Sequence, residues 1–211
     1  MPRKNSRNTR GRIISAAWKL FYEQGYEDTT VEDIVFESET SKGSFYHYFP
    51  GKDALLGTLA YVFDEKYEQL MKTMDPDMDA MEALVFLNHE LFAMIDSGIS
   101  MDLVARLLST QLLARGERSL LDRNRTYFKL LRRIIARGLE RGQLRSDRTA
   151  GEILRAYAMW ERALLYDWCL SGGEYSLVAY TDKATPLFLA AYRSSSAESL
   201  AESLADSQRA L

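Results

Sequence analysis

The stretch from Thr29 to Lys52 constrains the fold of this chain more than any other part of its sequence. Thr30 can cap a helix over about 31–37, and acidic residues follow in the first turn, where the helix dipole favours them. Helix propensity then fails over 38–41, so we expect the chain to bend there and to restart with Ser41 as a new cap. The pattern predicts a helix-turn-helix.

The second helix of this motif, expected over about 42–48, is short and unusually polar. Phe45 and Phe49, four residues apart, are expected to form its buried face. The opposite side then carries Lys42, Ser44, Tyr46 and His47. Such a helix can enter the DNA major groove, where these groups meet base edges and phosphates. The alternative is a small surface helix whose tyrosines pack on neighbouring elements.

Several residues of this region match a known family in order: Phe21, Gly25, Tyr26, Thr29, Thr30, Val31, Ile34, the run 41–49 (SKGSFYHYF), Lys52, Leu55 and Leu56. They closely resemble the DNA-binding domain of the tetracycline-repressor (TetR/AcrR) family, over about the first quarter of the chain. The sequence departs from the family at Ser38 and Glu39, where an Ala-Gly pair is usual, and at Val35, where a small residue is usual. A left-handed glutamate costs on the order of 1 kcal/mol relative to glycine, so a differently shaped turn is expected.

The resemblance implies a homodimer that binds a palindromic operator in double-stranded DNA and leaves it when a small-molecule effector binds. Half-sites would lie about 34 Å apart, one helical turn. In this sequence the DNA-binding residues would be Thr30, Ser41, Lys42, Gly43, Ser44, Tyr46, His47, Tyr48 and Lys52. The resemblance also implies that the last two main helices form a four-helix bundle with their symmetry mates.

The charge of the chain is unevenly distributed. Its formal net charge of −3 argues against a protein that coats polyanions in general. The first dozen residues are nevertheless purely basic, with Arg3, Lys4, Arg7, Arg10 and Arg12. This arm could reach phosphates or the minor groove, or it could be a solvated tail.

Hydrophobic periodicity past Pro76 is helical throughout, and no hairpin signal interrupts it. We therefore predict an all-α protein of about nine helices, with a three-helix DNA-binding domain followed by a larger helical domain for ligand binding and dimerisation. The expected boundaries are 1–52, 53–193, and a Ser/Ala/Glu-rich tail at 194–211. The expected helices are 9–24, 31–37, 42–48, 52–74, 79–96, 101–114, 119–141, 149–170 and 177–192, the last kinked at Pro186.

Aromatic residues are spread over several helices of the larger domain. Tyr157, Glu161, Leu164 and Trp168 fall on one helical face, which would place a carboxylate between aromatic rings. In a cavity this arrangement suits a lipophilic and even cationic ligand. The alternative is a surface Glu161 paired with a neighbour such as Arg162. The predicted ligand-binding residues are Phe63, Tyr67, Phe86, Tyr127, Tyr157, Trp160, Glu161 and Trp168.

No catalytic or metal-binding constellation is expected, and no cofactor. Cys169 has no identifiable base, and the chain's two histidines lack metal-ligand spacing. The basic start lacks an apolar segment, and no long apolar run occurs, so we expect a cytoplasmic protein without a membrane partner. The sequence thus predicts a one-component transcriptional regulator, more often a repressor. The alternatives are an activator, a regulator without a ligand, or an enzyme with an accessory helix-turn-helix.

Overall fold

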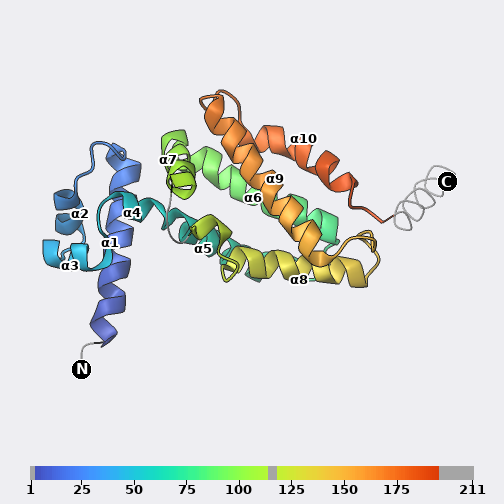
Figure 1. Ribbon diagram of the computed structural model, residues 1–211, viewed down its shortest axis with the longest axis horizontal. Coiled ribbons are helices and arrows are strands. Elements are labelled where there is room, and N and C mark those ends of the chain that lie inside the picture. Colours follow the sequence, from blue (N-terminus) through green and yellow to red (C-terminus); the bar gives the residue numbers. More distant parts are fainter. Residues whose placement is uncertain (1–2, 114–117, 195–211) are drawn as a thin grey trace. The chain divides into compact units, whose positions relative to one another are not determined.

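Helices are the regular elements of the part of the chain that this computed structural model describes, residues 3–113 and 118–194 (Figure 1). An isolated antiparallel bridge joins Leu144 and Arg193. The all-helical prediction is confirmed. The helices are α1 Arg3–Gln24, α2 Val31–Glu37, α3 Lys42–Tyr48, α4 Asp53–Leu56, α5 Leu59–Thr73, α6 Ala80–Gly98, α7 Met101–Leu113, the 3₁₀ turn η1 Ser119–Leu121, α8 Thr126–Glu140, α9 Ala150–Leu170 and α10 Leu177–Ala190.

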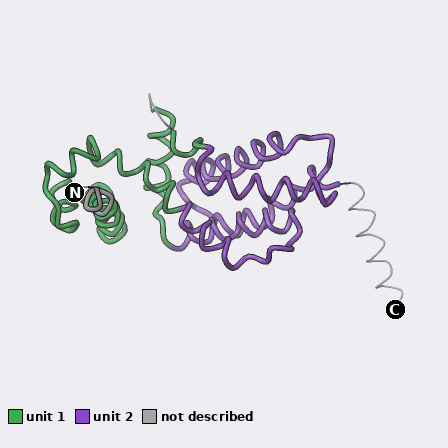
Figure 2. The backbone as a smooth tube through the Cα atoms, turned by 90° about the horizontal axis from the view of Figure 1, so that it is seen from below, with its two compact units in different colours: residues 1–62, 98–122 green, residues 63–97, 123–211 purple. Residues whose placement is uncertain are grey.

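The contacts divide the chain into two compact units, coloured separately in Figure 2. Unit 1 comprises residues 1–62 and 98–122, and unit 2 comprises residues 63–97 and 123–211. This division differs from the expected boundary at residue 52, because α4, the start of α5 and α7 group with the N-terminal helices. The expected tail, apart from Ser194, lies outside the described residues.

Unit 1 has a core built by α1–α4 and α7. Ile13, Ala17 and Phe21 of α1 are buried in this core, and Leu20 is half-buried against it. They pack with other buried side chains of unit 1, namely Tyr26, Ile34, Phe45, Phe49, Leu55, Leu56 and Leu103. Because these contacts come from both helices of the helix-turn-helix, the core fixes the orientation of α2 relative to α3.

The helix expected over 52–74 is divided into α4 and α5 by a break at Gly57 and Thr58. The Thr58 hydroxyl donates to the carbonyl of Leu55 at 2.6 Å and accepts from the Trp18 indole nitrogen at 2.8 Å. A tertiary contact from α1 therefore stabilises the break, which explains why the periodicity of the segment did not reveal it.

The helix expected over 119–141 is also interrupted, because α8 begins only at Thr126. Asp64 of α5 determines this start. One oxygen of its carboxylate accepts from the backbone amide of Tyr127 at 3.1 Å, while the guanidinium of the preceding Arg125 binds both oxygens, at 3.0 and 3.1 Å. A carboxylate from another helix thus takes the place of a local N-cap.

Unit 2 packs α8 closely against neighbouring elements at Gly138. A Cβ on this residue would lie 2.5 Å from the Cβ of Ala80 and 2.9 Å from Leu144 Cδ1. Only glycine fits this approach, and the Gln143 side-chain oxygen also accepts from the Ala80 amide at 3.0 Å.

The last helix, α10, continues through Pro186. No helix among the described residues is long and apolar enough to cross a membrane.

Candidate DNA-binding site and effector region

A side-chain N-cap precedes each helix of the helix-turn-helix, at the residue that the sequence predicted. Thr30 Oγ1 accepts from the Asp33 amide at 3.1 Å, and the Asp33 carboxylate accepts in return from the Thr30 amide at 2.8 Å. Ser41 Oγ accepts from the Ser44 amide at 3.0 Å. Both caps satisfy amides that the first turn of a helix leaves unpaired, so the short helices α2 and α3 begin at fixed positions.

The two faces of α3 differ as the sequence predicted. Phe45 and Phe49 are buried in the core of unit 1. Of the predicted DNA-binding residues in this segment, Ser44 and Tyr48 are half-buried, and those exposed are Ser41, Lys42, Gly43, Tyr46 and His47. The helix therefore presents a cation, an imidazole and a phenol to solvent, while its opposite face is anchored in the core. These polar groups can form hydrogen bonds with the edges of DNA bases.

The turn between the helices contains a left-handed residue although a glycine is absent, so the expectation of a differently shaped turn is wrong. Glu39 has φ = 46°, and it is the only residue other than glycine with positive φ among those described. The guanidinium of Arg12 donates to the carbonyls of Ser38 and Glu39. These bonds tie α1 to the turn and offset part of the cost of the unfavourable backbone conformation.

Glu32 and Lys42 form an ion pair between α2 and α3 that the sequence pattern did not reveal. The Glu32 carboxylate accepts from the Lys42 ammonium, and both side chains are exposed. The bond to Lys42 lowers the pKa of Glu32, and the bond to Glu32 raises the pKa of Lys42. Both groups are therefore charged at neutral pH.

Lys52 is engaged within unit 1. Its ammonium donates to the carbonyls of Tyr26 at 2.6 Å, Thr29 at 2.8 Å and Glu27 at 3.4 Å. It also lies 4.2 Å from the centroid of the Tyr26 ring. Lys52 thus holds the loop between α1 and α2 in the free protein, whereas the sequence analysis placed it among the DNA-binding residues.

Replacing Lys52 with alanine should therefore affect stability. We expect the free energy of unfolding to fall by about 2 kcal/mol, because hydrogen bonds from a charged group to loop carbonyls are lost. Urea unfolding measures this change. Lys42→Ala is the matched control and should stay within about 0.5 kcal/mol of the parent, because it breaks only an exposed pair. An unchanged Lys52→Ala unfolding curve would leave Lys52 with a DNA-contacting role alone.

Glu161 is buried in unit 2, within a polar network. Its carboxylate accepts from the hydroxyl of Tyr127 on α8 and, at 3.1 Å, from the side-chain amide of Asn88 on α6. Asn88 accepts in turn from Thr185 of α10 at 2.9 Å. Only 4% of Glu161 is exposed, so the alternative of a surface glutamate is wrong.

The hydrogen bonds of this network bear on whether the carboxylate of Glu161 needs a cationic ligand. Burial raises the pKa of Glu161, while the bonds from Tyr127 and Asn88 act in the opposite direction. Since two donors of the protein already meet the carboxylate, a cationic ligand is not required to compensate it. The hydroxyl of Tyr67 nearby is buried without a hydrogen-bond partner, and its ring centroid lies 5.3 Å from that of Tyr127.

The other predicted ligand-binding residues lie in unit 2 in two settings. Trp160 is half-buried and its ring stacks on Phe188, with centroids 4.8 Å apart. Phe86 is also half-buried. The fully packed members of the set are Phe63, Tyr67, Tyr127, Tyr157 and Trp168.

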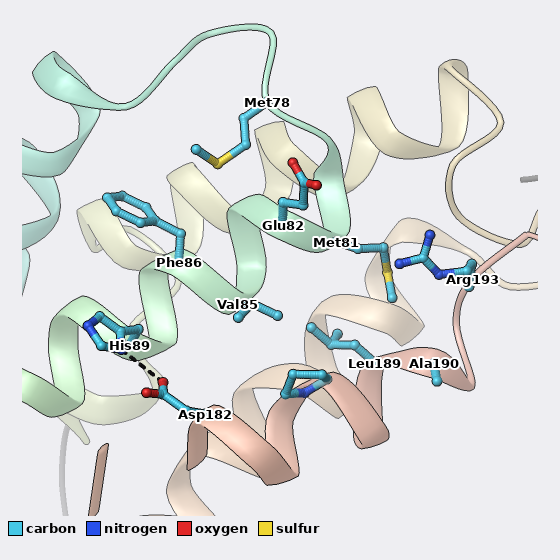
Figure 3. A pocket seen from close by; sticks show the side chains of 11 residues that line it. Met78, Met81, Glu82, Val85, Phe86, His89, Asp182, Leu189, Ala190 and Arg193 are labelled. Atoms are coloured by element: carbon cyan, nitrogen blue, oxygen red, sulfur yellow. Dashed lines mark hydrogen bonds and ion pairs between the residues drawn. The ribbon is translucent and has the colours of Figure 1, made fainter. Parts of the chain in front are cut away.

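A surface groove of about 520 Å³ lies between α6 and α10 (Figure 3). Of the predicted set only Phe86 lines it. His89 of α6 and Asp182 of α10 pair across it at 2.8 Å. The sequence analysis did not predict the other lining residues. Those on or just before α6 recur at helical spacing: Met78, Met81, Glu82 and Val85. Those on or just after α10 are Asp182, Pro186, Leu189, Ala190 and Arg193.

The Cys169 thiol and the possible metal ligands of the described residues are arranged as follows. Burial raises the pKa of the Cys169 thiol to about 11, which disfavours the reactive thiolate. Within residues 3–113 and 118–194, no group of three or more histidine, cysteine or acidic side chains is placed to hold a metal ion.

Comparison with known proteins finds a family match within unit 1. Residues 13–59 match the model of bacterial regulatory proteins of the tetR family. An uncharacterised helix-turn-helix transcriptional regulator of Bacillus subtilis, YuxN, is 45% identical over 60 residues, which are 28% of this chain and 21% of that protein. The chain thus matches about a fifth of the length of this curated relative.

Solved structures resemble the whole fold at lower identity. A TetR-family regulator of Pectobacterium atrosepticum has a TM-score of 0.72 and 20% identity, covering 92% of this chain and 98% of that one. The FadR regulator of Bacillus subtilis, solved with stearoyl-CoA, has a TM-score of 0.64 and 19% identity, covering 85% and 97%. These likenesses show the fold, and residues 13–59 of the chain match the tetR family of bacterial regulatory proteins.

Proposed function

We propose that this protein is a one-component transcriptional repressor that binds a palindromic DNA operator as a homodimer and leaves it when a small molecule binds unit 2. The observation that carries the proposal is the exposed polar face of α3. Lys42, Tyr46 and His47 lie on it, opposite the buried Phe45 and Phe49. A short helix anchored in this way is suited to the major groove. Such a regulator acts in the cytoplasm, where its DNA lies.

An exposed apolar stripe on α9 supports the homodimer. It consists of Met159, Ala163, Tyr166 and Leu170, and the half-buried Ala156 continues it at the alternating spacing of three and four residues. On α10, Tyr180 and Leu187 are exposed, the latter by 77%. The spacing is that of a helix seam, and a second copy of the chain would bury both stripes in a four-helix bundle. Two-fold symmetry then requires a palindromic operator.

The core around Glu161 supports an effector site in unit 2. The Tyr67 hydroxyl is a buried donor without a partner, and an effector that supplies an acceptor would satisfy it. The eight aromatic and acidic residues predicted from the sequence stay our proposal for its surroundings. Stearoyl-CoA, which the FadR structure contains, makes acyl-CoA thioesters the first compounds to test beside lipophilic cations.

Selection from a random duplex library tests the DNA-binding proposal. The parent protein should enrich a palindrome whose half-sites lie about 34 Å apart, and a compound that binds unit 2 should release this DNA. Transcription from a reporter that carries the palindrome distinguishes a repressor from an activator. Failure to enrich any sequence, or turnover of a bound compound without an effect on DNA, would contradict the proposal.

A further inference from the structure

The ion pair between Glu32 and Lys42 lies at the end of α3 from which recognition helices contact bases. Lys42 is the first residue of α3, and Glu32 is the second residue of α2. Recognition helices present their N-terminal residues to base edges. The carboxylate of Glu32 therefore belongs to the same surface as the candidate base-reading cation, although α2 itself is not the recognition helix.

Both members of this pair line a surface groove of about 480 Å³. Val35, Phe36, Glu39 and Thr40 line it together with Glu32 and Lys42. Phe36 is 86% exposed, so the groove is open to solvent beside the pair. Both charged side chains are exposed, so they are accessible to a base edge that approaches this surface.

The two charges have opposite preferences for DNA. An unpaired lysine binds any phosphate, which adds affinity without sequence preference. A carboxylate beside it cancels the charge and repels phosphates. The major-groove edge of a G·C pair offers a match for both groups, because guanine N7 and O6 accept from lysine and the cytosine N4 amino group donates to glutamate.

We infer that Glu32 is a specificity-determining residue, which acts with Lys42 to read one G·C base pair in each half-site and to suppress binding to other sequences. This inference rests on the proposed function, since it requires that α3 contacts DNA. The mutual pKa changes of Glu32 and Lys42 agree with a pair that is charged when DNA arrives. The pair is exposed, so a base edge can displace it at little cost.

Glu32→Gln tests the inference, with Glu37→Gln as the matched control. Glu37 is on the same helix and pairs with Lys19 at 2.6 Å, so its substitution changes the net charge equally without touching Lys42. For the DNA selected by the parent, the Glu32→Gln preference for G·C over A·T at one symmetric pair of positions should fall by about 5- to 150-fold. Its binding to unrelated DNA should tighten relative to Glu37→Gln, with a salt slope steeper by about one.

A double-mutant cycle completes the test. In a Lys42→Ala background, Glu32→Gln should have no further effect on the preference at these positions, because the two residues act as one reader. Glu32→Gln behaving as Glu37→Gln does in preference and salt slope would overturn the inference and leave the regulator assignment intact. A parent protein that selects no DNA sequence would instead overturn the proposed function.

Discussion

Asp64→Ala is expected to lower the free energy of unfolding by about 3–5 kcal/mol, which is the cost of breaking a buried ion pair from one side. The side chains of Asp64 and Arg125 are only 10% and 5% exposed. Removing the carboxylate takes away the acceptor of two hydrogen bonds from the buried Arg125 guanidinium. It also removes the acceptor of the Tyr127 amide, so the first turn of α8 loses its cap.

Urea unfolding at one fixed protein concentration measures this effect. Asp77→Ala is the control in the same unit, because Asp77 pairs with Arg141 at 2.9 Å but is 81% exposed, and it should cost less than about 1 kcal/mol. The double variant Asp64→Leu, Arg125→Met should lower the free energy of unfolding less than Asp64→Ala does, because no charge stays buried. Equal effects of Asp64→Ala and Asp77→Ala would show that the buried pair does not determine the start of α8.

Glu161→Leu should destabilise the protein by about 2–5 kcal/mol, because two donors, the Tyr127 hydroxyl and the Asn88 amide, then lack their acceptor. Glu161→Gln keeps one acceptor oxygen and adds a side-chain amide NH2 that can donate a hydrogen bond to the hydroxyl oxygen of Tyr127. It should therefore cost less than the leucine variant. Comparison of the two by urea unfolding separates the loss of hydrogen bonds from the loss of charge.

The pH dependence of the parent follows from the same residue. The pKa of Glu161 is raised in the folded state above its ordinary value of 4.5, so the folded protein binds the proton more tightly than the unfolded chain does. The contribution of Glu161 to stability is therefore greatest below pH 4.5 and falls as pH rises toward the raised pKa of the folded state. Glu161→Gln should lack this component, and an identical pH dependence of unfolding in both proteins would contradict it.

Local chemistry made most of unit 1 predictable. Thr30 and Ser41 cap the helices next to them, and Gly25 ends α1 with φ = 88°, so each signal lies within a few residues of its effect. The late start of α8 could not be predicted in this way, because the carboxylate that caps it lies 61 residues before its partner Arg125 in the sequence.

In the candidate effector region and DNA-binding site as well, local features were predictable and contacts between helices were not. Helical periodicity placed Glu161 on the face of Tyr157 and Trp168, and those three residues are indeed buried. Its hydrogen-bond partners come from α6 and α8, which periodicity in α9 does not reveal. The pair of Glu32 with Lys42 depends likewise on the angle between α2 and α3, which the core of unit 1 determines.

The central claim, that α3 reads DNA sequence, is tested most directly by removing its exposed groups together. The variant with Lys42, Tyr46 and His47 all replaced by alanine keeps Phe45 and Phe49, so it should unfold at about the same temperature as the parent. Fluorescence anisotropy, at one salt concentration, gives the ratio of dissociation constants for unrelated DNA and for the selected palindrome. We expect a ratio of about 10³ or more for the parent and near one for the variant. A variant that retains the parent's ratio would show that another surface reads the operator.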